Sequence, residues 1–191
     1  MVDFTVAIPT YNGATRLPKV LERLRSQIQT EHFSWEIVVV DNNSNDRIAE
    51  VIQEVQKNWP HTYPLRYVFE AEPGAAFARN RAVEAARGNL IGFLDDDNLP
   101  DADWVAAAYE FGQTHPRAGA YGSQIHGKFE GELPKDFKKI AVYLAIIERG
   151  STASRYEPQQ KILPPAAGLV VRKQAWCDHV PKRLFLNHTS R

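Results

Sequence analysis

The chain has 191 residues, of which 43% are hydrophobic and 24% charged, a composition that excludes a disordered polypeptide. Because Lys plus Arg and Asp plus Glu each number 23, no net charge attracts nucleic acid. Cys177 is the single cysteine, which excludes an internal disulfide, and no apolar run approaches the ~18 residues of a membrane span.

Patterns of strand and helix alternate through the first two-thirds of the chain. Short β-branched or apolar runs predict strands, and apolar residues at helical spacing predict helices. The predicted strands are 4–8, 36–40, 65–69 and 90–94, and the predicted helices are 17–28, 47–55, 75–87 and 103–111. This order predicts an α/β fold with a largely parallel, Rossmann-like sheet and helices on both faces.

The last third of the chain is less regular. We expect strands at 118–125 and 167–171, a helix at 138–148, a polar loop at 150–160 and a short helix or turn at 173–177. No linker separates this part, so residues 1–191 are predicted to form one domain. The first residues, MVDFTVAIP, lack the basic start of a signal peptide, and we expect a cytoplasmic location.

Polar clusters follow three of the predicted strands. They are residues 9–12 (PTYN), 41–44 (DNNS) and 95–97 (DDD). Parallel strands bring their carboxyl ends to one edge of a sheet, where ligands of open α/β sheets bind. We therefore expect the three clusters to converge on one site.

The acidic cluster predicts a metal site. Side chains alternate along a strand, so we expect Asp95 and Asp97 to lean the same way and Asp96 the opposite way. Neighbouring carboxylates are unfavourable unless a cation neutralises them, and ligands that offer only oxygen suit Mg²⁺ or Mn²⁺. The alternative is that the acids cap the next helix and lie in water, although Asp101 is already available as that cap.

Two other interpretations of the acids do not fit their surroundings. An EF-hand loop would need Gly at Pro100 and a bidentate Glu at Ala106. A phosphatase motif of the D-x-D-x-T type would need Thr or Val at Leu99 and would open the fold instead of following its fourth strand.

Four segments in this order resemble the family 2 glycosyltransferases: TVAIPTYN (5–12), EIVVVDNNSND (36–46), EPGAAFARNRAVEAARG (72–88) and IGFLDDDNLP (91–100). Within that family, the chain is most similar to bacterial enzymes of surface polysaccharide or exopolysaccharide synthesis, including the hormogonium polysaccharide type. The resemblance implies the GT-A fold and a metal-assisted, inverting transfer of sugar from a nucleotide-diphosphate donor. A UDP-sugar is the favoured donor. A glycan or lipid-linked acceptor, and peripheral association with the inner face of the plasma membrane, are also implied.

The resemblance assigns roles to the strand-end residues. It implies that Pro9, Thr10 and Tyr11 line the base and ribose, and that Asp41 accepts a hydrogen bond from the base. The alternatives are that Tyr11 packs within the protein and that Asp41 caps a helix. Gly74 would let the backbone approach the ligand closely.

The same resemblance implies which residues lie next to the diphosphate, the metal and the acceptor. Arg79 would approach the diphosphate, although a surface arginine is the alternative. Asp97 is the expected direct metal ligand, Asp95 contacts ribose or metal, and Asp96 completes the nucleotide-sugar set at the variable position. On the acceptor side, Ala167 and Gly168 would leave room for a sugar, unless the alanines only pack a strand tightly.

A catalytic base is missing from the expected place. In the family it is an Asp in a Glu-Asp motif after the small-residue segment, but Asp178 is the only acid after Arg172 and lacks that context. We expect the base beyond Arg191, so a donor-binding fragment without catalysis is an alternative function. Leu184 and Phe185 would then form an exposed apolar surface.

A sugar-1-phosphate nucleotidylyltransferase is the remaining alternative. It would need a glycine-rich basic loop after the first strand, and TYNGATRLPK has one glycine there.

Overall fold

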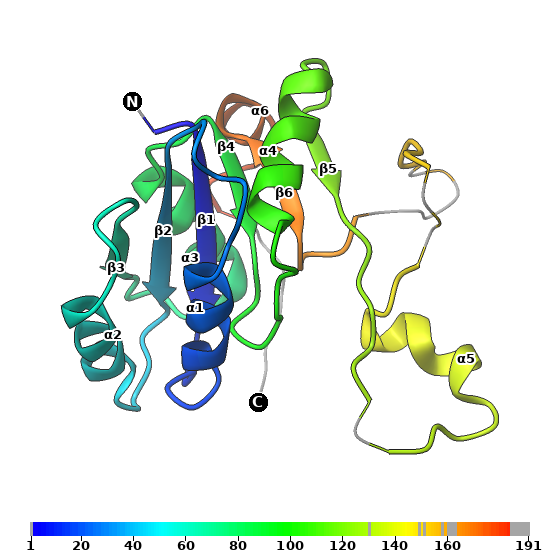
Figure 1. Cartoon of the computed structure of the whole chain (residues 1–191), viewed down its shortest axis with the longest axis horizontal. Coiled ribbons are helices and arrows are strands. Elements are labelled where there is room, and N and C mark those ends of the chain that lie inside the picture. The colour runs from blue at the N-terminus through cyan, green and yellow to red at the C-terminus, as the bar shows by residue number, and fades with distance from the viewer. Residues whose placement is uncertain are drawn as a thin grey trace.

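A computed structural model describes residues 2–129, 131–148, 150, 152–157, 159 and 164–183. Within these residues, one sheet has the strand order β3-β2-β1-β4-β6-β5 (Figure 1). The strands are β1 (Phe4–Thr10), β2 (Trp35–Asp41), β3 (Leu65–Phe69), β4 (Leu90–Phe93), β5 (Ala120–Gly122) and β6 (Leu169–Arg172). The helices are α1 (Leu17–Arg25), α2 (Ile48–Lys57), α3 (Ala75–Ala85), α4 (Trp104–Thr114), α5 (Phe137–Ile140), the 3₁₀ helix η1 (Ala141–Leu144) and α6 (Lys173–His179).

Helices cover both faces of the sheet, because β1 and β2 are apolar on both sides. Alternate residues of β2 belong to different cores: Ile37 and Val39 face one way, and Val38 and Val40 the other. One core packs against the buried residues of α1, α2 and α4, and the other against α3 and Trp176 of α6. The predicted α/β class and largely parallel sheet are confirmed.

The sheet departs from a purely parallel arrangement at one side. Strands β3, β2, β1 and β4 run parallel, whereas β6 is antiparallel to both β4 and β5. The reversed β6 therefore begins at the same edge where β4 ends, since Gly92 pairs with Val170 and Leu90 with Arg172. This brings the predicted acceptor-side residues to the carboxyl edge of the sheet.

The predicted helix at 138–148 is wrong over its second half. Helix α5 and η1 end at Leu144, and Ala145 has a left-handed backbone with φ of 56°. Ile147 then exchanges two backbone hydrogen bonds with Ile125, of 2.9 and 3.0 Å, which extend the chain and exclude a helix there. Leu184, Phe185 and part of the predicted loop at 150–160 lie outside the described residues.

A buried carboxylate links several strands at the edge of the sheet where the parallel strands begin, opposite their carboxyl ends. Glu36 is fully buried and accepts hydrogen bonds from the Thr5 hydroxyl (3.1 Å), the Arg66 guanidinium (2.9 Å) and the Arg87 amide (2.7 Å). The Thr5 hydroxyl also accepts one from the Gly88 amide. These contacts link the starts of β1, β2 and β3 to the turn before β4.

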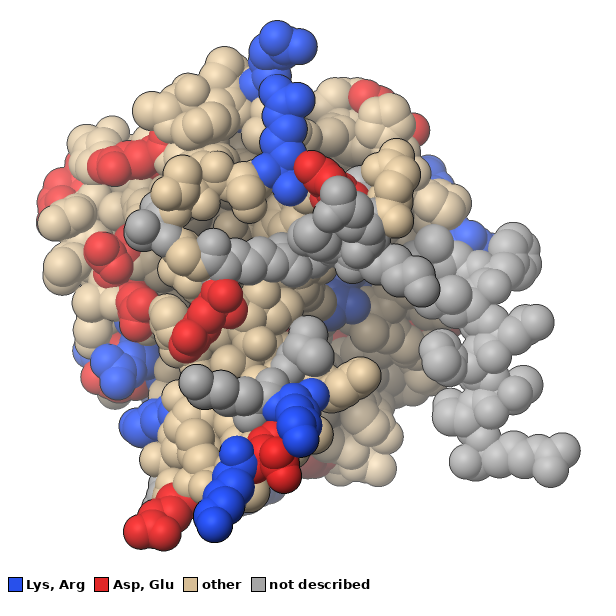
Figure 2. Space-filling view, turned by 90° about the vertical axis from the view of Figure 1, so that its right-hand side faces the viewer, with Lys and Arg blue, Asp and Glu red and all other residues tan. Residues whose placement is uncertain are grey.

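Both signs of charge occur on the face of the molecule that carries α5 (Figure 2), as the balanced composition predicts. No helix among the described residues is long and apolar enough to cross a membrane.

Candidate functional site

The ends of β1 and β2 are held together by their loops. Thr10 and Asp41, the last residues of the two strands, are register partners. The Asn12 amide donates to the Ser44 hydroxyl (2.9 Å), and the Asn45 amide donates to the Asn12 side chain (3.0 Å). The predicted convergence of the first two polar clusters therefore agrees with this geometry.

The acidic cluster forms a turn instead of continuing β4. The last ladder bond runs from the Leu94 amide to the Ala7 carbonyl (3.0 Å), and the Asn98 amide then donates back to the Asp95 carbonyl (3.2 Å). The expectation that strand alternation orients the acids is therefore wrong, because β4 ends at Phe93. Residues 95–98 instead form an acidic turn.

Asp96 is the buried member of the acidic turn. Its carboxylate accepts hydrogen bonds from the Thr10 hydroxyl (2.6 Å) and from two nitrogens of Arg16 (2.9 Å each). The pKa of the Arg16 guanidinium is raised by this hydrogen bonding and by the charge of Asp96. Thr10 and Asp96, both expected to face the nucleotide, thus bind each other, and their contacts with a ligand stay a prediction.

Asp95 and Asp97 have more open surroundings. Asp95 lies 3.7 Å from the Arg79 guanidinium. Burial raises the pKa of the Asp95 carboxyl, Arg79 opposes that shift, and the neighbouring acids add to it. Asp97 is exposed and forms no ion pair with any described residue, while the buried Oδ1 of Asn98 has no hydrogen-bond donor among them.

The donor set fits Mg²⁺ or Mn²⁺ bound together with a substrate. No group of three His, Cys, Asp or Glu residues suited to a metal ion occurs in the part of the chain that is described. Magnesium, however, needs only one or two protein carboxylates when substrate phosphates and water complete its shell. Asp97, with Asp95 beside it, would supply these oxygens.

Asp41 is held firmly at the end of β2. It is 4% exposed, and its two oxygens accept hydrogen bonds from the Ser44 amide (2.9 Å) and the Tyr67 hydroxyl (2.7 Å). Burial, and then the hydrogen bond to Asp41, raise the pKa of Tyr67 to about 12. Tyr11, by contrast, is 56% exposed and leaves its ring available for stacking.

Two site-forming residues were missed by sequence reasoning. Arg16 was not recognised, although it is the only basic residue in the polar loop after β1. Asn42 donates to the Glu72 carbonyl and accepts from the Gly74 amide, both at 2.7 Å, so it fixes the turn that carries Gly74. Gly74 has φ of 139°, which favours glycine.

The acceptor-side segment reaches the acidic turn. The Gly168 amide donates to the Phe93 carbonyl (2.8 Å), directly before Leu94 and Asp95. Beyond it, a hollow of about 1130 Å³ extends along β5 between the end of α4 and a side formed by Gly150 and residues 152–156. Ala167 is buried and a Cβ at Gly168 would lie 2.5 Å from the Ser123 Oγ, so open space at this point comes from the hollow and not from these two residues.

We expect Gly168→Ala to destabilise the fold by about 1–2 kcal/mol, because the left-handed backbone at φ 71° penalises a side chain. The added Cβ would also lie 2.5 Å from the Ser123 Oγ, which must turn away. Urea unfolding measures the loss. Gly131→Ala is the matched control, since its Cβ would meet nothing within 4 Å. Equal stabilities of the two variants would contradict this role of Gly168.

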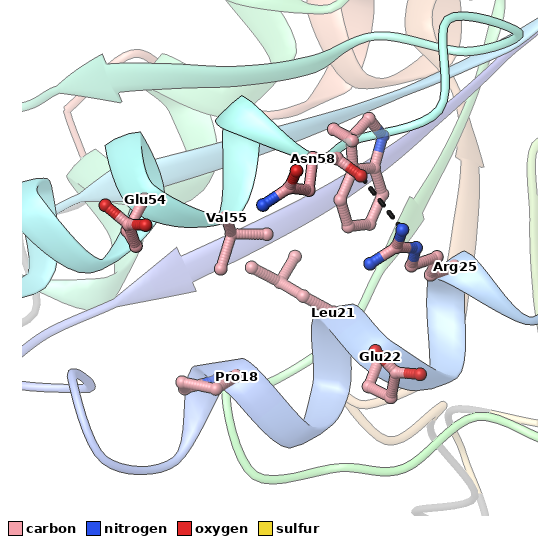
Figure 3. Close-up of a pocket in the computed structure, with 8 residues that line it drawn as sticks. Pro18, Leu21, Glu22, Arg25, Glu54, Val55 and Asn58 are labelled. Atoms are coloured by element: carbon pink, nitrogen blue, oxygen red, sulfur yellow. Dashed lines mark hydrogen bonds between the residues drawn. The ribbon is translucent and has the colours of Figure 1, made fainter.

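A smaller hollow of about 240 Å³ lies between α1 and α2 (Figure 3). Leu21 and Val55 form its apolar side, and the Arg25 guanidinium closes one end by donating to the Asn58 carbonyl (2.9 Å). Its residues come from α1, α2 and the two positions after α2, and not from the strand ends, so it is separate from the strand-end site.

The fold and the strand-end cluster define an α/β protein whose polar clusters gather at the carboxyl edge of β1, β2 and β4. The sequence profile of glycosyl transferase family 2 matches residues 5–173, and the chain belongs to this family. It is 30% identical over 165 residues to the uncharacterized glycosyltransferase YfnE of Bacillus subtilis, covering 77% of this chain and 41% of YfnE.

Two groups of solved structures share the fold. S. aureus TarS in complex with UDP-GlcNAc superposes with a TM-score of 0.63 at 20% identity, over 93% of this chain and 47% of TarS. The mannosyltransferase PcManGT of Pyrobaculum calidifontis, in complex with GDP-Man and Mn²⁺, superposes with a TM-score of 0.64 at 23% identity. This match covers 95% of this chain and 48% of PcManGT. The chain thus spans about half or less of the length of these relatives.

Proposed function

We propose that this chain binds a nucleotide-diphospho-sugar, with a UDP-sugar as the favoured donor, along the carboxyl edge of β1, β2 and β4. The observation that carries the proposal is the acidic turn, which offers the exposed Asp97 beside the joined ends of β1 and β2. The ligands of TarS and PcManGT, UDP-GlcNAc and GDP-Man, support it by analogy of fold.

In this proposal the base binds at the ends of β1 and β2. Pro9, Thr10 and Tyr11 line the base and ribose, and the exposed ring of Tyr11 stacks against a flat ligand. Asp41 accepts a hydrogen bond from the base N–H, since each of its oxygens has a second lone pair beside its bond to Ser44 or Tyr67.

The diphosphate binds between Arg79 and the acidic turn. The guanidinium of Arg79 donates to phosphate oxygens, for which its planar fork is suited. Asp97 and Asp95 hold Mg²⁺ or Mn²⁺, which offsets the charge of the leaving diphosphate. Asp96 contributes to the donor site from its buried position, and Gly74 lets the backbone of its turn approach the ligand.

For the whole protein we propose an inverting transfer to a glycan or lipid-linked acceptor of a surface polysaccharide, in the cytoplasm at the inner face of the plasma membrane. The acceptor would enter past Ala167 and Gly168, next to the hollow along β5. Asp178 is disfavoured as the base, because β6 ends and α6 begins at the opposite edge of the sheet.

The place of Asp178 favours one alternative, which is donor binding without transfer by these residues. A transfer assay with a donor and acceptor panel separates the two functions. Donor binding itself is tested by calorimetric titration of UDP, GDP and CDP with Mn²⁺ or with EDTA. We expect UDP with Mn²⁺ to bind most tightly, and failure of all three diphosphates to bind would refute the proposal.

We expect Asp41→Ala to weaken UDP binding by about 1–3 kcal/mol, because the base N–H is left without its acceptor. The variant should also distinguish uridine from cytidine nucleotides less well than the parent does. Titration of both nucleotides measures this loss of discrimination.

Two variants separate recognition by Asp41 from its structural role. Glu50→Ala removes an exposed acid of α2 and should bind like the parent. Tyr67→Phe removes the hydroxyl that holds Asp41 but leaves the carboxylate, so it should keep the base preference. If Asp41→Ala discriminates between the bases like the parent, Asp41 does not read the base.

A further inference from the structure

The three adjacent acids of the acidic turn do not have equivalent surroundings. Asp96 is 8% exposed and binds Arg16, which precedes α1. Asp95 lies near Arg79, which belongs to α3. Helices α1 and α3 cover opposite faces of the sheet, so the two guanidinium groups approach the turn from opposite sides.

This arrangement leaves Asp97 as the acid of the turn that forms no ion pair with a described residue, although its charge also acts on Arg16 from a greater distance. Two of the three negative charges are offset, and the turn retains about one net charge for a bound cation. The balance depends on Arg16 more than on Arg79, because Arg16 makes two hydrogen bonds of 2.9 Å whereas the Arg79 pair is 3.7 Å apart.

The contact between Arg16 and Asp96 also fixes where the turn lies. The Thr10 hydroxyl donates to the same carboxylate, and the Arg16 guanidinium donates to the Tyr11 carbonyl (3.2 Å). Gly13 makes room for this: a Cβ there would lie 2.1 Å from the Thr10 Oγ1 and 2.4 Å from the Asp96 Oδ2. The end of β1 and the acidic turn are therefore held against each other by side chains.

We propose that Arg16 is a positioning residue for metal-dependent donor binding, acting through Asp96 to hold the acidic turn so that Asp97 faces the diphosphate. The inference rests on the proposed function. Arg16 itself contacts neither the metal nor the nucleotide. Its role resembles that of a residue that hydrogen-bonds to a metal ligand and so orients it. Loss of such a hydrogen-bonding partner typically lowers metal affinity by roughly 10–100-fold.

The test is the ratio of UDP affinities with Mn²⁺ and with EDTA in Arg16→Gln. We expect this ratio to fall by roughly 10–100-fold. Because the ratio compares one variant with and without Mn²⁺, a change in base binding through the contact of Arg16 with the Tyr11 carbonyl affects both affinities and cancels. The direction is informative, because removal of a positive charge alone would tighten cation binding. A ratio that rises, or stays equal to that of the parent, would overturn the inference.

Matched variants separate positioning from charge and from general damage. Arg81→Gln makes the same change at a partly exposed arginine of α3 that pairs with Glu84, and it should leave the ratio unchanged. In a double-mutant cycle with Asp96→Asn, the ratio of the double variant should fall no further than that of the single variant with the larger loss, because the two residues act as a unit. Additive losses would show that they act separately and would overturn the inference.

Gly13→Ala provides an independent route, because its methyl group displaces Thr10 and Asp96 without changing any charge. It should lower the same ratio. If the parent chain binds UDP equally with Mn²⁺ and with EDTA, the proposed function fails and this inference fails with it. If the parent shows the difference and both Arg16→Gln and Gly13→Ala keep it, only this inference fails.

Discussion

In the Asp97→Ala variant, we expect UDP to bind with nearly the same affinity whether Mn²⁺ or EDTA is present. Asp97 is the acid of the turn that forms no ion pair with a described residue, so it has the carboxylate most available to a cation. Loss of a residue that hydrogen-bonds to a metal ligand costs roughly 10–100-fold in metal affinity, so loss of the ligand itself should cost about 100-fold or more. Calorimetric titration of UDP in Mn²⁺ and in EDTA measures the two affinities.

Asp101→Ala is the matched control, since Asp101 is an exposed acid just beyond the acidic turn. It removes the same charge and should keep the full effect of Mn²⁺. Binding by Asp97→Ala that still tightens with Mn²⁺ as in the parent would show that the cation is held elsewhere, with Asp95 as the next residue to replace.

The largest loss of stability is expected from Glu36→Ala. The substitution leaves the Thr5 hydroxyl, the Arg87 amide and the partly buried Arg66 guanidinium without their acceptor. Removal of one member of a buried ion pair typically costs about 3–5 kcal/mol. A domain of this size is stable by about 5–15 kcal/mol, so the variant should lose between about a fifth and all of its stability.

Urea unfolding followed by tryptophan fluorescence measures this loss. Glu54→Ala, which removes an exposed partner of Lys57, should change stability by less than about 1 kcal/mol. The Glu36 contacts lie at the edge of the sheet opposite the acidic turn, so the folded fraction of Glu36→Ala should bind UDP like the parent. A loss as small as that of the control would contradict the structural role given to Glu36.

The parts of the fold that follow a repeating pattern could be predicted from the sequence. Apart from Glu36, the runs at 36–40 and 90–94 carry no polar side chain, and the spacing of Leu17, Val20, Leu21 and Leu24 is helical, so the pattern of buried residues predicts these elements. The segment at 138–148 also has a helical pattern, but the pairing of Ile147 with Ile125 ends it, and that contact has no local signal.

The strand-end residues of the site could be located, but not their mutual contacts. The sequence order places Thr10, Asp41 and Asp95 at one edge of a parallel sheet. It does not reveal that Asp96 binds Arg16 or that Asn42 fixes the turn before α3. These contacts join loops far apart in the sequence through single side chains, which leave no periodic pattern.

The reversed strand β6 has a consequence for how this family can diversify. Gly122 at the end of β5 pairs with Leu169 at the start of β6, so the chain leaves the sheet and returns to it at neighbouring positions. An excursion with fixed, adjacent endpoints can change in length and sequence without altering strand register, because loop closure depends only weakly on length. Under the proposed function, the donor site at the ends of β1, β2 and β4 can therefore stay constant while the excursion changes to suit different acceptors.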